Sequence, residues 1–286
     1  MRNKYTVLLW LTFAGLAPGL VQAGEVPDAD QALKELQKGN ARFAKGKMLQ
    51  LRRDQIRLEE TAKGQHPFVT VLTCSDSRLP PEIVFDQGLG DVFTVRVAGN
   101  VADVDEIGTI EYGVGHLHTP LCVVLGHTAC GAVTAVVKGA EVHGNIPALV
   151  DNIVPAVENA RQQHPELSED QLIPAAIEAN VFQSISDLFT HSEEVRDLVK
   201  EGKLRVLGAV YDLQTGKVRW LGVHPGQAAL LHGGAASHGE AAPAAAKSAE
   251  AEHAPEKAEP AKHAEPAAKH EEPVKKKAEP SRGGGH

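Results

Sequence analysis

The chain has 286 residues, a formal net charge of −8 at pH 7, and 42 % hydrophobic and 4 % aromatic residues. The acidic balance, together with the lack of stretches that combine aromatic and basic residues, argues against nucleic acid as a partner. The first 23 and the last 54 residues differ in composition from the rest, as described below. About 210 residues remain between them, which is enough for one substantial hydrophobic core.

The amino terminus has the pattern of a secretory signal peptide over residues 1–23. Arg2 and Lys4 precede an apolar run at residues 7–16, and the small residue Ala23 offers a cleavage site before Gly24. An uncleaved membrane anchor is the alternative, but the apolar run is short for a membrane span. We therefore predict cleavage, a periplasmic or secreted protein, and no stable membrane span.

The central part, residues 24–232, predicts one α/β domain. It begins at residues 28–62 with two helices whose apolar residues are spaced for one face. Strands are predicted from short apolar runs at residues 68–73, 92–96 and 121–125, and a hairpin from residues 204–211 and 218–223. Helices are expected at residues 106–118, 130–138, 148–162, 168–191 and 192–200. This order predicts a mostly parallel central sheet with flanking helices and an amino-terminal helical arm.

Two motifs that carry chemistry follow two of these strands directly. Cys74 comes after the first strand, with Asp76 and Arg78 close behind, and His127 and Cys130 come after the strand at 121–125. Because ligands bind beyond the carboxyl ends of parallel strands, these residues can meet in space. Two thiolates and an imidazole suit zinc, and three protein ligands leave one position open, as in catalytic zinc sites.

Simpler interpretations of these residues exist. Cys74 and Cys130 could form a disulfide in an exported chain, but a disulfide explains neither His127 nor the Asp76 and Arg78 pair. That pair could be a local structural ion pair, or Arg78 could hold Asp76 as a carboxylate for chemistry. We favour the zinc interpretation because ligand type and strand-end placement agree.

The carboxyl end, residues 233–286, consists almost entirely of Ala, Pro, Glu, Lys, His and Gly. Such a segment cannot bury enough apolar surface to offset its ordering entropy, so we predict a disordered low-complexity tail. Its histidines could gather metal ions, but widely spaced ligands on a flexible chain lose much entropy when they share one ion. A solubilising role is therefore favoured.

At its two motifs the chain resembles the β-class carbonic anhydrases, whose zinc signature pairs Cys-x-Asp-x-Arg with His-x-x-Cys. Further blocks at residues 85–91, 96–100 and 108–112 extend the resemblance over roughly residues 32–223. It implies one zinc ion per chain, held by Cys74, His127 and Cys130, and reversible hydration of carbon dioxide to bicarbonate and a proton by zinc-bound hydroxide. Asp76, held by Arg78, would orient the attacking water or, released, become a fourth zinc ligand.

The resemblance also implies a substrate pocket and an oligomer. Gln65 matches a glutamine that hydrogen-bonds substrate oxygen, and Phe93 and Tyr112 match an aromatic wall contributed partly across a dimer interface. Ala98 stands where some members have valine, and the Gly131 N–H could donate to a developing oxyanion. Core packing is the alternative for the two aromatic residues. A homodimer or a higher even oligomer is implied, with the arm reaching over a partner subunit.

Two other functions fit the same ligands. Members of the same fold hydrolyse carbon disulfide or carbonyl sulfide, and a non-catalytic zinc-binding protein is the alternative from another class. The presence of Asp76, Arg78 and Gln65 argues against a storage role, because a storage site needs no activated water. Proton-transfer candidates are suggested by residue type alone, and a surface role is favoured for each: His66, His116 and His118.

Overall fold

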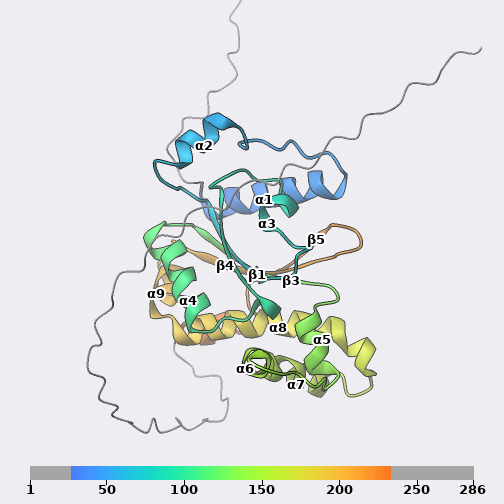
Figure 1. Cartoon of the computed structure of the whole chain (residues 1–286). Helices are drawn as coiled ribbons and strands as arrows, with labels where there is room; N and C mark the ends of the chain where they lie inside the picture. The colour runs from blue at the N-terminus through green and yellow to red at the C-terminus, as the bar shows by residue number, and fades with distance from the viewer. Residues whose placement is uncertain (1–26, 233–286) are drawn as a thin grey trace, which may run out of the picture. The chain divides into compact units, whose positions relative to one another are not determined.

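The computed structural model describes residues 27–232 (Figure 1). The predicted signal peptide at residues 1–23 and the predicted tail at residues 233–286 lie outside this range, so both stay predictions. Within residues 27–232, no helix combines the length and the apolar character that crossing a membrane requires.

Five strands form one sheet in the order β2-β1-β3-β4-β5. Four of them are parallel, β1 (Val69–Cys74), β2 (Val92–Val97), β3 (Leu121–His127) and β4 (Arg205–Tyr211), and β5 (Val218–Gly222) runs antiparallel to β4. Every residue of β1 and β3 is buried, which explains their continuous apolar sequences. The mostly parallel sheet with flanking helices and an amino-terminal arm is thus confirmed.

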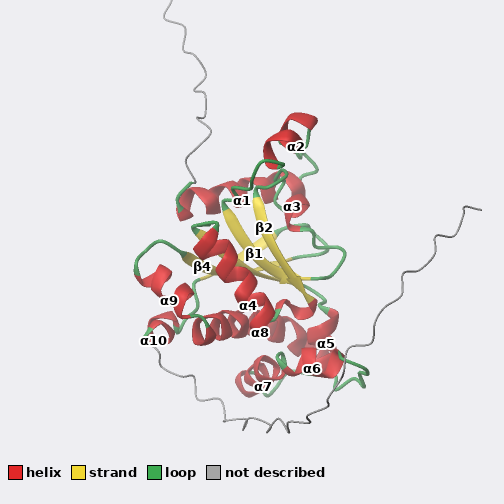
Figure 2. Cartoon of the chain, turned by 60° about the vertical axis from the view of Figure 1, so that its left-hand side comes forward, coloured by secondary structure: helices red, strands yellow, loops and turns green. Residues whose placement is uncertain are grey.

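Helices cover the sheet on opposite sides (Figures 1 and 2). The arm helix α1 (Ala29–Ala44) lies on one side, and the long helix α8 (Glu169–His191) lies on the other, where it packs against β3 and β4. The remaining helices are α2 (Gln55–Thr61), α3 (Pro81–Val84), α4 (Val104–Glu111), α5 (Gly131–Val137), α6 (Ile146–Asp151), α7 (Val154–Gln163), α9 (Glu193–Lys200) and α10 (Gln227–Leu231).

Two predicted helices differ in detail from the observed ones. The helix expected at 148–162 is two helices, α6 and α7, because Pro155 sits at the start of α7, where its missing N–H is tolerated. The helix expected at 106–118 begins at Val104, behind a capping box of Asp103 and Glu106, and continues past residue 111 as a π-helical turn, η2 (Tyr112–His116).

A buried carboxylate attaches the arm to the sheet domain. The Asp86 side chain is fully buried and accepts hydrogen bonds from the Arg42 Nε at 2.6 Å and from the backbone N–H groups of Leu49 at 2.9 Å and Gln50 at 3.0 Å. These contacts join α1, the segment that follows it and the loop after α3. They are one of several sets of polar contacts that fix the path of the arm.

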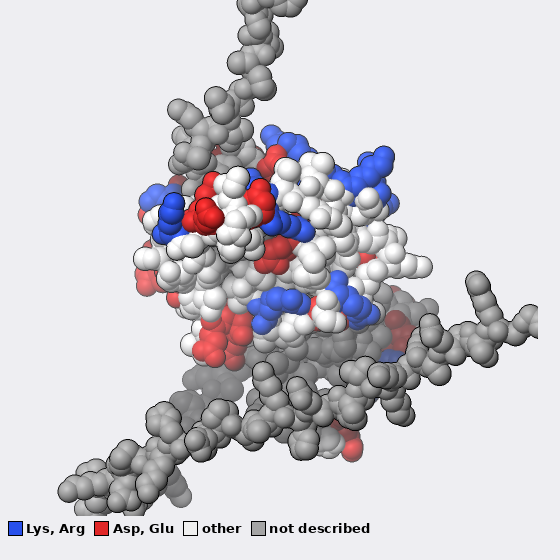
Figure 3. Space-filling model, turned by 45° about the horizontal axis from the view of Figure 1, so that its top comes forward, with Lys and Arg blue, Asp and Glu red and all other residues white. Residues whose placement is uncertain are grey.

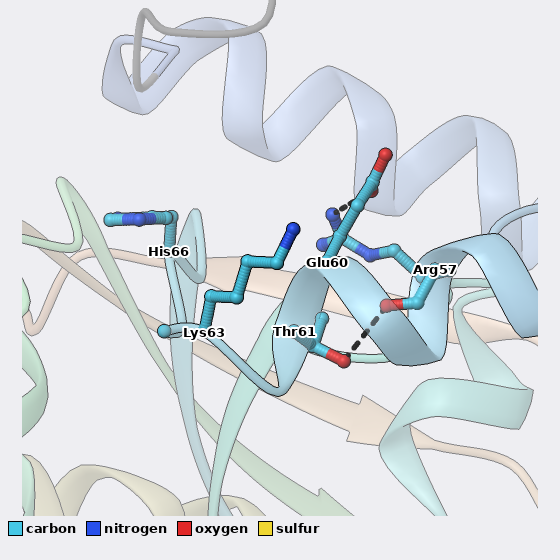
Figure 4. A pocket seen from close by; sticks show the side chains of 6 residues that line it. Arg57, Glu60, Thr61, Lys63 and His66 are labelled. Carbon is cyan, nitrogen blue, oxygen red and sulfur yellow. Dashed lines mark hydrogen bonds and ion pairs between the residues drawn. The ribbon is translucent and has the colours of Figure 1, made fainter.

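A second buried carboxylate, Asp91, accepts from Arg52 at 2.8 Å and from Arg57 at 3.2 Å. Arg57 also pairs with Glu60 within α2, as Figure 4 shows. Basic and acidic side chains are interspersed over the face drawn in Figure 3. The arm is therefore fixed by charged contacts that need both partners in place, in addition to apolar packing.

Candidate metal centre

The three predicted ligands come together at the carboxyl ends of the parallel strands β1 and β3. Cys74 ends β1, His127 ends β3, and Cys130 directly precedes α5. Their ligand atoms all lie within 4.8 Å of one another. Their exposed fractions are 5 %, 0 % and 1 %. Adjacent parallel strands in register produce this convergence, since Thr73 lies opposite Leu125 and the two strands end close together, at Cys74 and His127.

The imidazole of His127 is oriented for coordination. Its Nδ1 lies 2.9 Å from the carbonyl oxygen of Thr128, which can only accept, so Nδ1 carries the proton and Nε2 has a free lone pair. That Nε2 is buried and has no hydrogen-bond partner. An unpartnered buried polar atom costs about 1–3 kcal/mol, and coordination to a metal ion would remove this cost.

The two thiols beside it are also suited to a metal. All three cysteines of the chain are free, so the structure contains no disulfide between Cys74 and Cys130. The hydrogen bond from Cys130 lowers the pKa of Cys74 against the effect of burial, with further help from the Gly99 N–H. The pKa of Cys130 is raised in turn, because the pair shares one proton next to the Cys74 thiolate. A zinc ion would displace that proton and bind two thiolates and one imidazole, a donor set typical of zinc.

Asp76 is held away from these ligands by Arg78. The guanidinium donates to both carboxylate oxygens, at 2.9 and 2.7 Å, and the Arg78 backbone N–H adds a third bond at 2.9 Å. These contacts hold the pKa of Asp76 well below its usual range. One oxygen nevertheless lies 3.9 Å from the His127 Nε2. A charged acceptor thus stands beside the metal cluster without belonging to it.

Arg96 is a site residue to which the sequence analysis gave no role. From β2 it donates to the carbonyl oxygens of Cys74 at 3.2 Å and Asp76 at 2.6 Å, and so fixes the backbone of the first motif. A signal was present in the sequence, because Arg96 interrupts an otherwise apolar and β-branched run. What the run could not show is that the side chain turns toward the end of β1.

Two of the five predicted pocket residues lie close to the thiols. Ala98 precedes Gly99, whose N–H donates to the Cys74 Sγ at 3.3 Å. Gly131 is exposed and is the first residue of α5, directly after Cys130. Their role in a substrate pocket stays a prediction.

The other three pocket residues lie toward the amino ends of the parallel strands, away from Cys74. Phe93 is in register with Thr70, four residues before Cys74, which is roughly 13 Å at about 3.3 Å per residue. Tyr112 packs on Phe93 with ring centroids 5.8 Å apart, and Gln65 is exposed in the loop before β1. Within one chain these three side chains do not join the metal cluster.

The three histidines considered for proton transfer all lie on the surface. His66 borders the small pocket of Figure 4, next to Lys63. His116 stacks on Tyr112 with ring centroids 4.7 Å apart, and His118 follows the π-helical turn. Their exposure agrees with the surface role that the sequence favoured.

Comparison with known proteins identifies relatives over nearly all of this domain. The family model for carbonic anhydrases matches residues 69–218. Carbonic anhydrase 2 of Mycobacterium tuberculosis is 35 % identical over 190 residues, which cover 65 % of this chain and 89 % of that protein. A carbonic anhydrase of Mycolicibacterium smegmatis is 36 % identical over 192 residues, covering 65 % of this chain and 90 % of the relative.

Solved structures show the same fold. The β-carbonic anhydrase CafA of Aspergillus fumigatus matches with a TM-score of 0.54 and 30 % identity, over 71 % of this chain and 96 % of that one. The Coccomyxa β-carbonic anhydrase, solved with acetazolamide, gives a TM-score of 0.55 at 25 % identity, over 71 % and 90 % of the two chains. A tetrameric β-carbonic anhydrase of Sordaria macrospora gives 0.51 at 27 % identity, over 58 % and 86 %.

Proposed function

The chain belongs to the β-class carbonic anhydrases, enzymes of carbon dioxide hydration, and we propose that it works through one zinc ion per chain held by Cys74, His127 and Cys130. The observation that carries this proposal is the buried cluster of two thiols and an imidazole whose Nε2 has no partner. Zinc bound there would supply Lewis-acid chemistry, lowering the pKa of a coordinated water toward neutrality, as is established for carbonic anhydrases.

Asp76 and Arg78 would position the attacking water. Arg78 keeps Asp76 charged and directs its carboxylate: Oδ1 accepts two hydrogen bonds from Arg78, whereas Oδ2 accepts one and retains acceptor capacity. Asp76 can therefore accept a hydrogen bond from the water and align it with carbon dioxide. Because the Arg78 side chain is 57 % exposed, the pair adds little to stability, which favours a positional role. Released from Arg78, Asp76 would instead close the site as a fourth ligand.

The substrate pocket would be completed by a second chain. Ala98 and Gly131 lie on the metal side of the same chain, and the exposed Gly131 N–H would donate to the oxyanion that develops on the substrate. The metal site of a partner subunit would be served by Gln65, Phe93 and Tyr112, since these residues lie toward the amino ends of the strands in their own chain. This arrangement requires a homodimer or a higher even oligomer, and the Sordaria macrospora relative is described as tetrameric.

We further propose that the protein acts in the periplasm or outside the cell. The support for this is the signal-peptide pattern of residues 1–23. Amino-terminal sequencing of the protein recovered from its native host tests it. A first residue of Gly24 is expected, and an intact Met1 would contradict the proposal.

The metal assignment is tested by a matched pair of variants. Cys74→Ser should lose most of the zinc and the turnover, because a hydroxyl is a poor substitute for a thiolate ligand. Cys122→Ser is the control, since Cys122 is equally buried in β3 but is not one of the clustered ligands. Zinc per chain and carbon dioxide hydration are measured on the same samples. A fully metallated and active Cys74→Ser protein would contradict the ligand assignment.

A further inference from the structure

The turn η1 (Ala98–Asn100), which follows β2, provides a backbone donor to one of the metal ligands. The Gly99 N–H donates to the Cys74 Sγ at 3.3 Å. Gly99 has a φ of 76° and Asn100 a φ of 49°, so two consecutive residues adopt the left-handed conformation. Glycine reaches this region freely but is not confined to it. The direction of the N–H must therefore be fixed by contacts outside the turn.

Two polar side chains of α8 provide these contacts. The Asn180 Nδ2 donates to the carbonyl oxygen of Gly99 at 2.6 Å, and the Ser184 Oγ lies 2.9 Å from the carbonyl oxygen of Asn100 and 2.9 Å from that of Asn180, which share its one proton. Asn180 and Ser184 are each only 1 % exposed. Their i, i+4 spacing places them on the same face of α8, so one rigid helix anchors two consecutive carbonyl groups of the turn.

The amide of Asn180 is buried at a cost in free energy, which indicates that it has a function. Its Oδ1 is buried and has no hydrogen-bond partner. An apolar side chain of similar size would avoid this unsatisfied atom, and burying an amide without a full set of partners is unfavourable. The turn has no room for a side chain at Gly99 that could fix its conformation, because a Cβ there would lie 2.6 Å from the Ile153 Cδ1.

We propose that Asn180 and Ser184 are positioning residues of the metal centre, which hold the Gly99 N–H on the Cys74 sulfur. An N–H donor withdraws electron density from a thiolate and so weakens its donation to the metal ion. With two thiolates in the ligand set, this would keep zinc a strong enough Lewis acid. The inference rests on the proposed zinc site.

The test uses the full chain with cobalt(II) in place of zinc, so that the metal–sulfur bond can be observed directly. Asn180→Leu and Ser184→Ala remove one anchor each. Ser186→Ala is the matched control, because Ser186 lies on the same helix but hydrogen-bonds the His224 Nε2, at 3.1 Å. The sulfur-to-cobalt absorption band should move to longer wavelength in the first two variants and stay in place in the control.

The zinc forms of the same variants give a second readout. The kcat for carbon dioxide hydration should fall about 10-fold in Asn180→Leu, the lower end for losing such a supporting residue, with little change in KM. If Asn180→Leu does not fold, the milder Ser184→Ala carries the test.

The outcomes separate this inference from the proposed function. An unshifted band in Asn180→Leu and Ser184→Ala, with any loss in thermal stability matching the control, would show that the two residues only pack α8 and would overturn the inference alone. A wild-type protein that binds neither zinc nor cobalt would overturn the metal site and this inference together. A shifted band in both variants with a normal control supports it.

Discussion

The buried carboxylate of Asp86 offers a sharp test of how the arm is attached. Asp86→Ala removes the acceptor for the Leu49 and Gln50 backbone N–H groups and the partner of Arg42. A donor left unpaired costs about 1–3 kcal/mol when buried, but water can reach these exposed loop residues and the Arg42 side chain, which is 26 % exposed. We therefore expect a loss of about 2–4 kcal/mol in the free energy of unfolding.

Urea unfolding at a fixed protein concentration measures this loss. The control is Glu35→Ala, which removes an exposed partner of Lys38 on the same helix, α1, and should cost less than about 0.5 kcal/mol. A loss in Asp86→Ala no larger than in this control would show that the Asp86 carboxylate does not hold the arm in place. Asp86→Asn, which keeps the size of the side chain but not its charge, should fall between the two.

The same variant has a defined pH dependence. Burial alone would raise the pKa of Asp86, but the donors Leu49, Arg42 and Gln50 outweigh it and lower the pKa below the usual 3.8. The stabilisation is therefore complete above pH 3.8 and is lost as the pH falls through the folded-state pKa. The stability difference between the wild type and Asp86→Ala should shrink on acidification, and a difference that grows below pH 3.8 would contradict the assignment.

Arg96→Met should lower both zinc content and turnover, because Arg96 fixes the carbonyl groups of Cys74 and Asp76. Metal analysis and hydration rates measure both effects, and unchanged values would contradict this role. Removing the metal with a chelator should make Cys74 the first thiol to react with iodoacetamide, since its pKa is lowered. Cys122 should stay unmodified, because burial raises its pKa to about 12. Peptide mass spectrometry distinguishes the two, and prior labelling of Cys122 would refute the prediction.

The parts of the fold that the sequence predicted are those with a local pattern. Strands buried on both faces have continuous apolar sequences, so β1 and β3 were recognisable, and the rule that ligands gather at the carboxyl ends of parallel strands brought Cys74 and His127 together. The break between α6 and α7 was also visible in principle, because Pro155 marks the start of a helix.

The remaining features depend on contacts between distant positions, which leave no periodic signal. Asn180 reaches Gly99 across 81 positions of the chain, and Arg96 turns back onto a loop that precedes it by about twenty residues. The separation of Phe93 and Tyr112 from the metal cluster likewise follows from strand register, which short apolar runs do not define on their own. Only the packed structure shows whether a side chain lies at the amino or the carboxyl ends of the strands.

The proposed function depends on a zinc site that hydrates carbon dioxide with the help of Asp76. Stopped-flow hydration of carbon dioxide, with zinc per chain measured on the same samples, tests it most directly on the wild type and Asp76→Asn. We expect about one zinc per chain in both proteins, clear turnover in the wild type, and a rate lower by about 10²–10⁴-fold in the variant. Full zinc without turnover in the wild type, or full activity in Asp76→Asn, would contradict it.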